Sequence, residues 1–438
     1  MLLIVDTKGN DFMRNAVSLF TSSGIGDLGL RANNIETVVA CELLPERMNL
    51  FQNNFPNAKC FQGDIWELKD SIVDYYNDTY KEPPFLIIAT PPCQGMSSNG
   101  MGKMLSDYRK GLRPKMDERN RLIIPAIDII KRLQPEWVIL ENVYNMVNTM
   151  IFDENDELVN IIDYIMRELG DLYVGSPHVI DVADYGVPQH RRRLITVLSR
   201  TEKGKKYYEK NDRLIPPYTH SETDTMFTKH WVTIREAIGS LPELRAEKGK
   251  NCDKSFNPLH KVPVLDEKKL WWVDNTPEGQ TAFNNQCVNP ECMYQGNKTH
   301  GASHNEEGIN QSHTDTPLYC EKCGALLPRP WVEDKDGSKR LMKGFVSAYK
   351  RMNWDDPAST LTQNFQFACS DNKIHPSQTR VLSLYEGLVI QSIADYDYSF
   401  KVGDKYVSDG LIRDTIGESV PPRVTDLICK NIIEIDES

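Results

Sequence analysis

Residues 15–29 read NAVSLFTSSGIGDLG, an apolar strand-like run followed directly by a turn rich in serine and glycine. A second strand-like run, ETVVACE (36–42), comes next, and the amphipathic stretch LPERMNLFQNNF (44–55) predicts a helix. In a doubly wound sheet, ligands bind at the carboxyl ends of the strands, over the first strand–helix turn. This stretch therefore predicts an open α/β sheet with a ligand site above residues 21–29.

Strand-like and helix-like segments continue to alternate up to about residue 205. The segments are PFLIIAT (84–90), ERNRLIIPAIDIIKRL (118–133), EWVILENV (136–143), ELVNIIDYIMRELG (157–170) and a closing hairpin formed by SPHVIDVADYG (176–186) and RRRLITVLS (191–199). Alternation of this kind predicts a parallel sheet with helices on both faces, a Rossmann-like α/β fold. A Gly residue after the helical pattern of 157–170 predicts that this helix ends at Gly170.

The composition changes after about residue 205. Up to about residue 375 the chain is polar, irregular and rich in Pro, Asn and Gly, which predicts a separate, loop-rich domain. The stretch IGESVPPRVTDLICKNIIEI (416–435) again predicts a helix with an apolar stripe. Pro421 and Pro422 are expected at its start, where a missing N–H costs least. We therefore expect a domain over residues 1–205, completed by the C-terminal helix 409–438, and a second domain over residues 206–408.

Length, charge and cysteine content limit the class of protein. The 438 residues are enough for two or three domains, and the net charge of −11 argues weakly against non-specific nucleic-acid binding. Locally basic stretches such as QHRRR (189–193) leave a basic cleft possible on an acidic body. The N-terminal MLLIVDTKGN has no basic leader, and we find no apolar run of about 18 residues, so the sequence predicts a cytoplasmic protein with no membrane span.

The glycine-rich turn and two acidic residues indicate a nucleotide-containing cofactor. Glu42 lies 18 positions after Gly24, at the end of the second strand-like run, where a carboxylate can bind ribose hydroxyls. A third strand-like run begins the stretch CFQGDI (60–65), and Asp64 lies on the loop after it, where it can contact an adenine. This spacing fits NAD, FAD or S-adenosylmethionine, and a turn that holds no cofactor is the alternative.

A cysteine lies in the stretch TPPCQGMS (90–97), directly after an apolar run. Pro91 and Pro92 fix the backbone and remove two N–H donors, while Gln94 and Gly95 let the chain turn away. Cys93 is therefore expected at the carboxyl end of a strand, over the ligand site. A thiolate there is a strong nucleophile if its pKa is lowered, whereas a merely packed thiol is the alternative.

Three motifs resemble one family of enzymes. PPCQGMS (91–97), ENV (141–143) and PQHRRR (188–193) occur in the order and approximate spacing of the cytosine-5 methyltransferases, which transfer methyl groups from S-adenosylmethionine to carbon 5 of cytosine in DNA. The resemblance covers nearly the whole chain apart from about residues 243–330. Its other motifs are SLF (18–20), GDI (63–65), DERN (117–120), VTIREAIGSLP (232–242), DDPASTLT (355–362), HPSQTRVLSLYEGLVIQS (375–392) and IGESVPP (416–422).

The resemblance assigns a role to each catalytic candidate. Cys93 would add to carbon 6 of a flipped cytosine, and Glu141 would hold the base by ring nitrogen 3 and the exocyclic amine. Arg193 would face the base and Arg191 would support the cysteine loop. Alternation along a strand also predicts that both arginines lie on one face, where two cations favour a thiolate. Residues 97–117 would form a mobile loop that closes over the base.

The resemblance also implies a set of cofactor-binding residues: Phe20, Ser22, Ser23, Gly24, Ile25, Gly26, Glu42, Leu43, Asp64, Ile65, Pro92, Leu122, Ser419 and Val420. Two departures stand out. The loop FTSSGIGDLG carries Ser22 and Ile25 at positions where the family has glycine. Glu418 replaces an asparagine of the final motif, and its charge is unfavourable near the cofactor's carboxylate unless it points elsewhere or meets the ammonium group.

Four cysteines cluster as CVNPEC (287–292) and CEKC (320–323), a spacing typical of a zinc ribbon. Cys287, Cys292, Cys320 and Cys323 are the predicted ligands, and His300, His304 or His313 could replace one of them. Loose, reduced cysteines are the alternative. The insert lies where the family has its target-recognition region, so a structural zinc ion there would support the reading of DNA.

The leading hypothesis is a DNA cytosine-5 methyltransferase serving restriction–modification, phage protection or epigenetic marking. We expect a monomer that acts on double-stranded DNA at the nucleoid of a bacterial or phage-infected cell, with a possible cognate restriction endonuclease. Methylation of tRNA, a catalytically silent DNA-binding scaffold and an NAD-dependent dehydrogenase are the alternatives. The dehydrogenase explains the nucleotide fold but none of the three motifs.

Overall fold

The computed structural model describes residues 14–92, 118–304, 310–312, 315–344 and 346–438. Its centre is a seven-stranded sheet in the order β3-β2-β1-β4-β5-β10-β8. The strands are β1 (Arg14–Leu19), β2 (Ile35–Glu42), β3 (Lys59–Gln62), β4 (Leu86–Ala89), β5 (Trp137–Val143), β8 (Val174–Asp181) and β10 (Arg192–Ser199). The order changes direction at β1 and β4, which places the carboxyl ends of both strands beside the turn that follows β1.

The sheet is mixed, whereas the alternating pattern predicted a parallel one. The five strands from β3 to β5 pair in parallel, but β10 pairs antiparallel with both β5 and β8. The connection from β8 to β10 is too short for a crossover helix, so the chain returns as a hairpin. The predicted hairpin is therefore confirmed, and it is the element that makes the sheet mixed.

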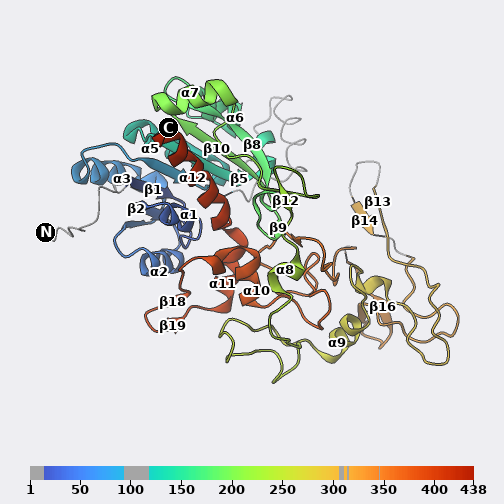
Figure 1. Cartoon of the computed structure of the whole chain (residues 1–438). Helices are drawn as coiled ribbons and strands as arrows, with labels where there is room; N and C mark the ends of the chain where they lie inside the picture. The colour runs from blue at the N-terminus through green and yellow to red at the C-terminus, as the bar shows by residue number, and fades with distance from the viewer. Residues whose placement is uncertain (1–13, 93–117, 305–309, 313–314, 345) are drawn as a thin grey trace.

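Helices cover both faces of the sheet, as predicted (Figure 1). The α-helices of the described residues are α1 (Asp27–Ala32), α2 (Pro45–Asn54), α3 (Ile65–Thr79), α5 (Ile123–Leu133), α6 (Ile161–Leu169), α7 (Glu202–Asn211), α8 (Ile234–Ile238), α9 (Glu267–Asp274), α10 (Leu384–Ile390), α11 (Asp409–Glu418) and α12 (Pro422–Glu437). One face packs against α3, α5 and α6, and the other against α1, α7 and α12. Strand alternation explains this division, because Ile87 contributes to the first core and Ile88 to the second.

The C-terminal segment forms two helices where one was predicted over 409–438, and the second begins at the prolines that were predicted to start it. Helix α11 ends at Glu418, the backbone of Ser419 is extended, and α12 begins at Pro422. Two prolines cannot supply the N–H groups that a continuous helix needs, so the chain breaks there. The helix α6 also ends at Leu169, and Gly170 keeps a right-handed helical conformation rather than a left-handed cap.

Beyond residue 212, short strand pairs replace the long sheet. They are β11 (His220–Ser221) with β12 (Lys229–His230), β13 (Ala302–His304) with β14 (Asn310–Ser312), β15 (Trp331–Glu333) with β16 (Lys339–Leu341), and β18 (Lys401–Val402) with β19 (Lys405–Tyr406). Within the first part of the chain β6 (Met150–Phe152) pairs with β7 (Leu158–Asn160), and β9 (Gln189–His190) pairs with β17 (Ala358–Ser359) across the two parts.

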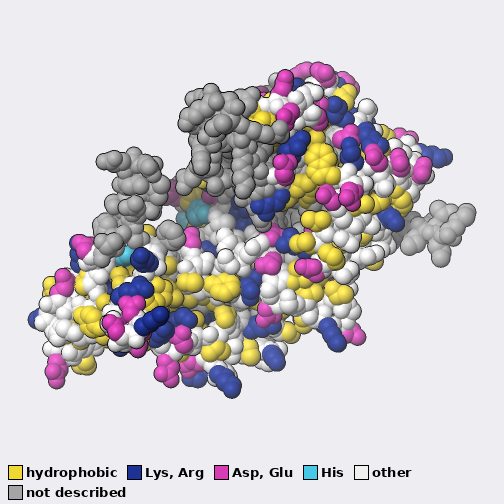
Figure 2. All heavy atoms as spheres, turned by 180° about the vertical axis from the view of Figure 1, so that it is seen from behind, with side chains coloured by type: hydrophobic (Ala, Val, Ile, Leu, Met, Phe, Trp, Pro, Cys, Tyr) yellow, Lys and Arg dark blue, Asp and Glu magenta, His cyan; other side chains and the backbone are white. Residues whose placement is uncertain are grey.

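The loop-rich part is joined to the sheet by a shared core. Phe51 of α2 packs in one cluster with Ile234, Leu388 and Ile416, residues far along the chain. On the face seen in Figure 2, the outline is hollowed between a larger and a smaller lobe, and Lys and Arg side chains lie along the hollow. Within the described residues, no helix is both long and apolar enough to cross a membrane.

Candidate active site

A cavity of about 780 Å³ opens at the carboxyl ends of β1, β2, β4 and β5, where the sequence predicted a ligand site. The predicted residues that line it are Phe20, Ser22, Ser23, Ile25, Gly26, Glu42, Leu43, Asp64, Ile65, Pro92, Leu122, Glu141, Arg191, Arg193, Ser419 and Val420. Gly24 is not among these lining residues. A Cβ atom on Gly24 would lie 2.6 Å from the rings of Phe51 and Phe55, so its role is to let α2 pack closely.

The turn after β1 offers polar atoms to the cavity. Phe20 and Ser22 both have a positive φ, which folds the turn back over the strand end. The buried hydroxyls of Ser22 and Ser23 have no hydrogen-bond partner among the described residues. A Cβ atom on Gly26 would meet open space. Unpaired buried hydroxyls beside open space fit a polar ligand, because unsatisfied groups of this kind are rare in folded proteins.

Glu42 and Asp64 hold the two loops that border the cavity. The carboxylate of Glu42 accepts hydrogen bonds from the backbone N–H groups of Ser22 and Leu44, each at 2.9 Å. Asp64 caps α3 by accepting from the N–H of Trp66 at 3.0 Å. Each carboxylate keeps free lone pairs, so both can still accept from a ribose or an adenine.

Asp27 lines the same cavity and was missed by the sequence analysis. Its carboxylate accepts hydrogen bonds from the hydroxyls of Ser18, Thr21 and Thr37, at 3.2, 3.0 and 2.8 Å. Burial raises the pKa of Asp27 to about 6, although these hydroxyls lower it. The signal was present in the sequence, since Ser18 and Thr37 are polar residues within otherwise apolar strands.

Glu141 and Arg193 form the second charged centre of the cavity. The Nε of Arg193 lies 2.9 Å from Oε1 of Glu141, where β10 runs antiparallel beside β5. Burial raises the pKa of Glu141, while the charges of Arg193 and Arg191 act to lower it. A buried carboxyl held beside two arginines is placed to form hydrogen bonds with a bound base.

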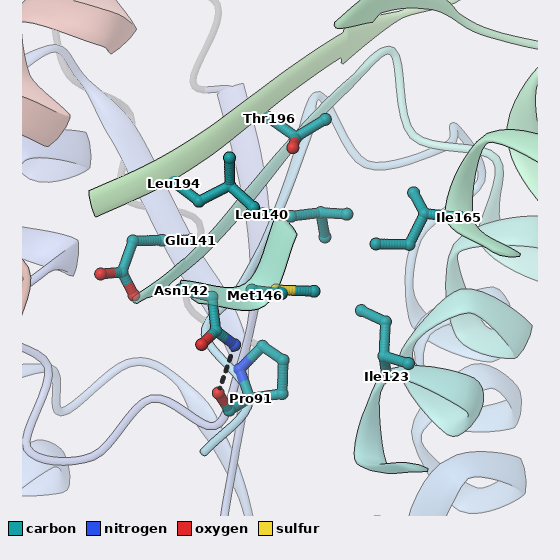
Figure 3. A pocket seen from close by; sticks show the side chains of 9 residues that line it. All are labelled: Pro91, Ile123, Leu140, Glu141, Asn142, Met146, Ile165, Leu194 and Thr196. Atoms are coloured by element: carbon teal, nitrogen blue, oxygen red, sulfur yellow. Dashed lines mark hydrogen bonds between the residues drawn. The ribbon is translucent and has the colours of Figure 1, made fainter. Parts of the chain in front are cut away.

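Asn142, the residue after Glu141, fixes the loop that leads to Cys93. Its side-chain amide donates to the carbonyl of Pro91 at 3.0 Å. Figure 3 shows this bond, and it shows the Glu141 carboxylate pointing to a different side. Pro91 and Pro92 both line the cavity, so the chain enters the predicted nucleophile loop at the cavity wall. Cys93 and the predicted closing loop 97–117 lie outside the described residues.

Arg191 lies in the break between β9 and β10 and is buried. It donates to the carbonyl oxygens of Leu361 at 2.7 Å and Gly417 at 2.8 Å. Both arginines of the predicted motif line the cavity. Arg193 pairs with the Glu141 side chain, whereas Arg191 ties the loop-rich part and the C-terminal segment to the cavity wall.

A chain of hydrogen bonds that the sequence did not reveal links Gln189 to Ser419. It donates to Gln391 at 2.7 Å, and Gln391 in turn donates to the backbone carbonyl and hydroxyl of Ser419 at 2.8 and 3.0 Å. Gln189 also accepts from the N–H of Leu361. Four segments far apart in sequence are thereby held at one wall of the cavity.

A model of the C-5 cytosine-specific DNA methylase family matches residues 14–434. The chain belongs to this family. The methylase is 28% identical over 425 residues to the type II methyltransferase M1.HgaI of Avibacterium volantium, a match that covers 95% of this chain and 97% of that protein. It is 23% identical to the type II methyltransferase M1.HphI of Haemophilus parahaemolyticus, over 96% of this chain and 87% of that protein.

The solved structures of similar proteins support the fold of the methylase. A DNA modification methyltransferase encoded within a prophage of E. coli superposes with a TM-score of 0.56 at 17% sequence identity, covering 97% of this chain and all of that one. Since members of the family use S-adenosylmethionine, the cavity is the place to test for it. The unpaired hydroxyls of Ser22 and Ser23, the open space at Gly26 and the free lone pairs of Glu42 fit this cofactor.

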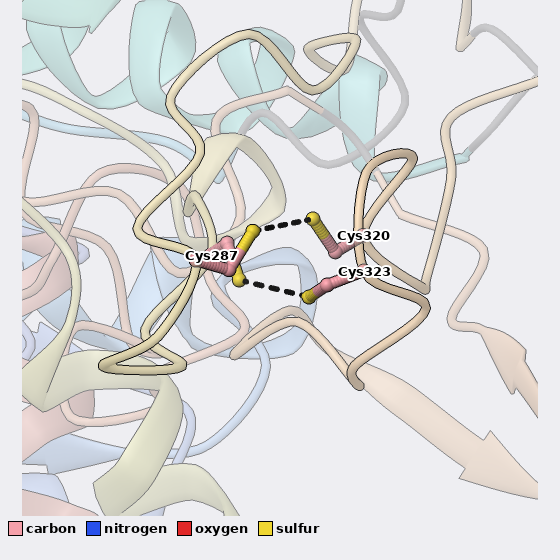
Figure 4. A group of neighbouring side chains, drawn as sticks. Cys287, Cys320 and Cys323 are labelled. Carbon is pink, nitrogen blue, oxygen red and sulfur yellow. Dashed lines mark hydrogen bonds between the residues drawn. The ribbon is translucent and has the colours of Figure 1, made fainter.

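The four predicted metal ligands of the methylase lie together in its loop-rich part (Figure 4). The sulfur atoms of Cys287, Cys292, Cys320 and Cys323 all lie within 4.8 Å of one another. Cys287 is 3.7 Å from Cys323, and Cys292 is 3.9 Å from Cys320, sulfur to sulfur. His300 is engaged elsewhere, since its ring contacts the Thr316 hydroxyl and the carbonyl of Gly344.

Proposed function

We propose that this methylase modifies cytosine in duplex DNA as the protective enzyme of a type II restriction–modification system. The observation that carries the proposal is the Glu141–Arg193 pair, 2.9 Å apart, which lines the same cavity as the turn after β1. A base-binding acid beside a methyl-donor pocket is the arrangement that the reaction needs. Its relatives named type II methyltransferases support the biological setting.

Each catalytic residue has a defined task in this proposal. The Cys93 thiolate forms a bond with carbon 6 of the cytosine, which makes carbon 5 nucleophilic. Glu141 donates a hydrogen bond to ring nitrogen 3 and accepts one from the exocyclic amine, and Arg193 holds the Glu141 carboxyl in place. S-adenosylmethionine supplies an electrophilic methyl group to carbon 5. A water molecule then takes the proton from carbon 5, the double bond between carbons 5 and 6 re-forms, and the bond from carbon 6 to sulfur breaks to release Cys93 as thiolate.

Different residues of the cavity would bind the two ends of the cofactor. Glu42 and Asp64 would bind the ribose and the adenine, with Leu43 and Ile65 packing against the ring. Ser22, Ser23 and Gly26 would contact the remainder of the cofactor, and Ser419 would close the opposite wall. Asp27 would act as a positioning residue, because its three hydroxyl donors join β1, the turn and β2.

We further propose that Cys287, Cys292, Cys320 and Cys323 hold a structural zinc ion. A tetrahedron with Zn–S bonds of about 2.3 Å has sulfur–sulfur edges of about 3.8 Å, and the distances of 3.7 and 3.9 Å fit it. Few apolar residues pack around these cysteines, so a metal ion would supply much of the local stability. The ribbon would belong to a target-recognition domain over residues 206–408, next to a catalytic domain of residues 1–205 completed by 409–438.

In this proposal the methylase acts as a monomer at the nucleoid of a bacterial cell. The cognate endonuclease is a separate chain. Bisulfite sequencing of DNA from cells that express the methylase tests it, because this method reports the modified base and its sequence context together. We expect one recurrent short site in wild type and none in Cys93→Ser. Methyl transfer to tRNA in place of duplex DNA would overturn the proposal, and so would persistent methylation by Cys93→Ser.

A further inference from the structure

Residues 219–231 form a short projection, here called the finger, built on the paired strands β11 and β12. At its tip the side chains of Met226 and Phe227 are 90% and 87% exposed, the highest values among the exposed large hydrophobic residues of the described chain. Two adjacent apolar side chains in water contribute nothing to the fold that holds them. An exposed apolar pair of this size indicates a binding surface.

The tip is held in one conformation by its own hydrogen bonds. The Thr225 hydroxyl accepts from the N–H groups of Phe227 and Thr228 at 3.1 and 3.0 Å, and the N–H of Thr225 donates to the carbonyl of Thr228 at 2.9 Å. The Ser221 hydroxyl contacts that of Thr228 and donates to the carbonyl of Thr223. A tip ordered in advance loses little conformational entropy when it binds.

The base of the finger is fixed to the segment that leads into the catalytic arginines. The indole of Trp231 donates to the carboxylate of Asp184 at 2.9 Å, and its ring lies edge-on to His190 at 4.8 Å. Asp181 binds both the ring of His190, at 3.0 Å, and the backbone N–H of Arg191, at 2.9 Å. Figure 1 shows β12 next to β9, at the junction between the sheet and the loop-rich part. The finger is thus mounted beside the cavity that must receive the target base.

We propose that Met226 and Phe227 are a wedge that enters duplex DNA next to the target base pair and fills the space left by the flipped cytosine. The inference rests on the proposed function for its substrate. Extrusion of a base breaks its stacking, and apolar side chains inserted at a base step replace part of that contact. Lys229 and His230 are exposed at the foot of the wedge and can contact flanking phosphates. Asp224 is turned into the finger, since it accepts from the N–H of His230.

The experiment compares wild type with Met226→Ala/Phe227→Ala on two duplexes that carry the identified site. In one duplex the target cytosine is paired with guanine, and in the other it faces adenine, so that less free energy is needed to flip it. Single-turnover methylation is measured at saturating DNA and cofactor. A matched duplex with 2-aminopurine at the target position reports the flipped population by its fluorescence.

We expect the double variant to be slower by about fivefold or more on the paired target, the lower limit for loss of one base–aromatic stack. On the mismatched target its rate should return to within about twofold of wild type, because flipping no longer needs the wedge. An equal loss on both duplexes would overturn the wedge, and so would a change in DNA affinity alone or no change.

Val402→Ala/Tyr406→Ala is the control, because it removes two exposed apolar side chains from a different pair of short strands, β18 and β19. It should behave as wild type on both duplexes, and both double variants should bind S-adenosylhomocysteine normally. Failure of the proposed function is recognised separately, because wild type would then methylate neither duplex.

Discussion

Arg47 of α2 forms a bidentate ion pair with the carboxylate of Glu418 at the end of α11, with two nitrogen–oxygen distances of 2.8 Å. Gln363 donates a further hydrogen bond to the same carboxylate. Burial raises the pKa of Glu418, and the Arg47 charge acts against that rise. All three residues line the cofactor cavity, so this pair answers the question that an acidic residue at position 418 raised. Its charge is compensated from within the chain.

Removal of Arg47 should therefore weaken cofactor binding. In Arg47→Gln the Glu418 carboxylate is left partly buried without a cation, at a cost of about 1–3 kcal/mol, and it repels the carboxylate of the cofactor. Calorimetric titration with S-adenosylhomocysteine measures the loss. The double variant Arg47→Gln/Glu418→Asn should recover most of the affinity, since it removes the stranded charge as well. A double variant that binds no better than Arg47→Gln would contradict this explanation.

The buried carboxyl of Asp27 should make stability depend on pH. Its pKa is about 6 in the folded chain and near 4 when unfolded, so the folded state binds the proton more tightly. The stabilisation is therefore complete below about pH 4 and is lost as the pH rises through about 6. Asp27→Asn mimics the protonated form and lacks this loss.

Denaturant unfolding at pH 4.5 and pH 7.5 checks the Asp27 prediction. We compare the free energy of unfolding of Asp27→Asn with that of wild type at each pH. The difference should shift in favour of the variant by on the order of 2 kcal/mol between pH 4.5 and pH 7.5. The variant Asp128→Asn, at a half-exposed position on α5, serves as the control and should show little of this change. A pH-independent difference for Asp27→Asn would show that Asp27 is charged throughout.

Glu141→Gln should abolish proton donation while keeping the shape of the site. An amide cannot protonate ring nitrogen 3, so single-turnover methylation should fall by about 100-fold or more. Affinity for S-adenosylhomocysteine should stay within about twofold of wild type, because the cofactor turn contacts other residues. Loss of cofactor affinity in proportion to rate would instead indicate a distorted cavity.

Zinc should leave the methylase when one cysteine of the cluster is replaced. Cys320→Ser is expected to reduce the metal content, measured by elemental analysis, from about one to well below one ion per chain, and to weaken DNA binding. Cofactor binding should persist, since the cluster lies outside the cavity. Cys252→Ser is the control, because Cys252 is an exposed free cysteine outside the cluster. Wild-type protein without bound metal would refute the zinc site.

Much of the site could be predicted because it depends on local sequence. The turn after β1, the acidic end of β2 and the residues that follow β4 and β5 meet at one edge, as the topology of an open sheet requires. The division of the sheet faces followed from strand alternation. The alternating pattern gives no strand direction, so it predicted a parallel sheet, although the predicted hairpin of β8 and β10 required an antiparallel pair.

Side-chain contacts between residues far apart in the chain could not be predicted from the sequence. Nothing in the pattern links Arg47 to Glu418, or Gln189 to Gln391, because these contacts depend on how the loop-rich part folds back on the sheet. Asp27 illustrates the intermediate case. Its polar partners in β1 and β2 were visible, but their convergence on one carboxylate required the strand register.

The packing of α12 on α1 has a consequence for the order in which the chain can fold. Gly29 lets the two helices touch, because a Cβ atom there would collide with Thr425 and with the backbone of Asp426. Helix α12 also covers the face of the sheet that holds Ile88 and Ile139. Residues 422–437 must therefore be made before α12 can dock, and until then only α1 and α7 cover this face.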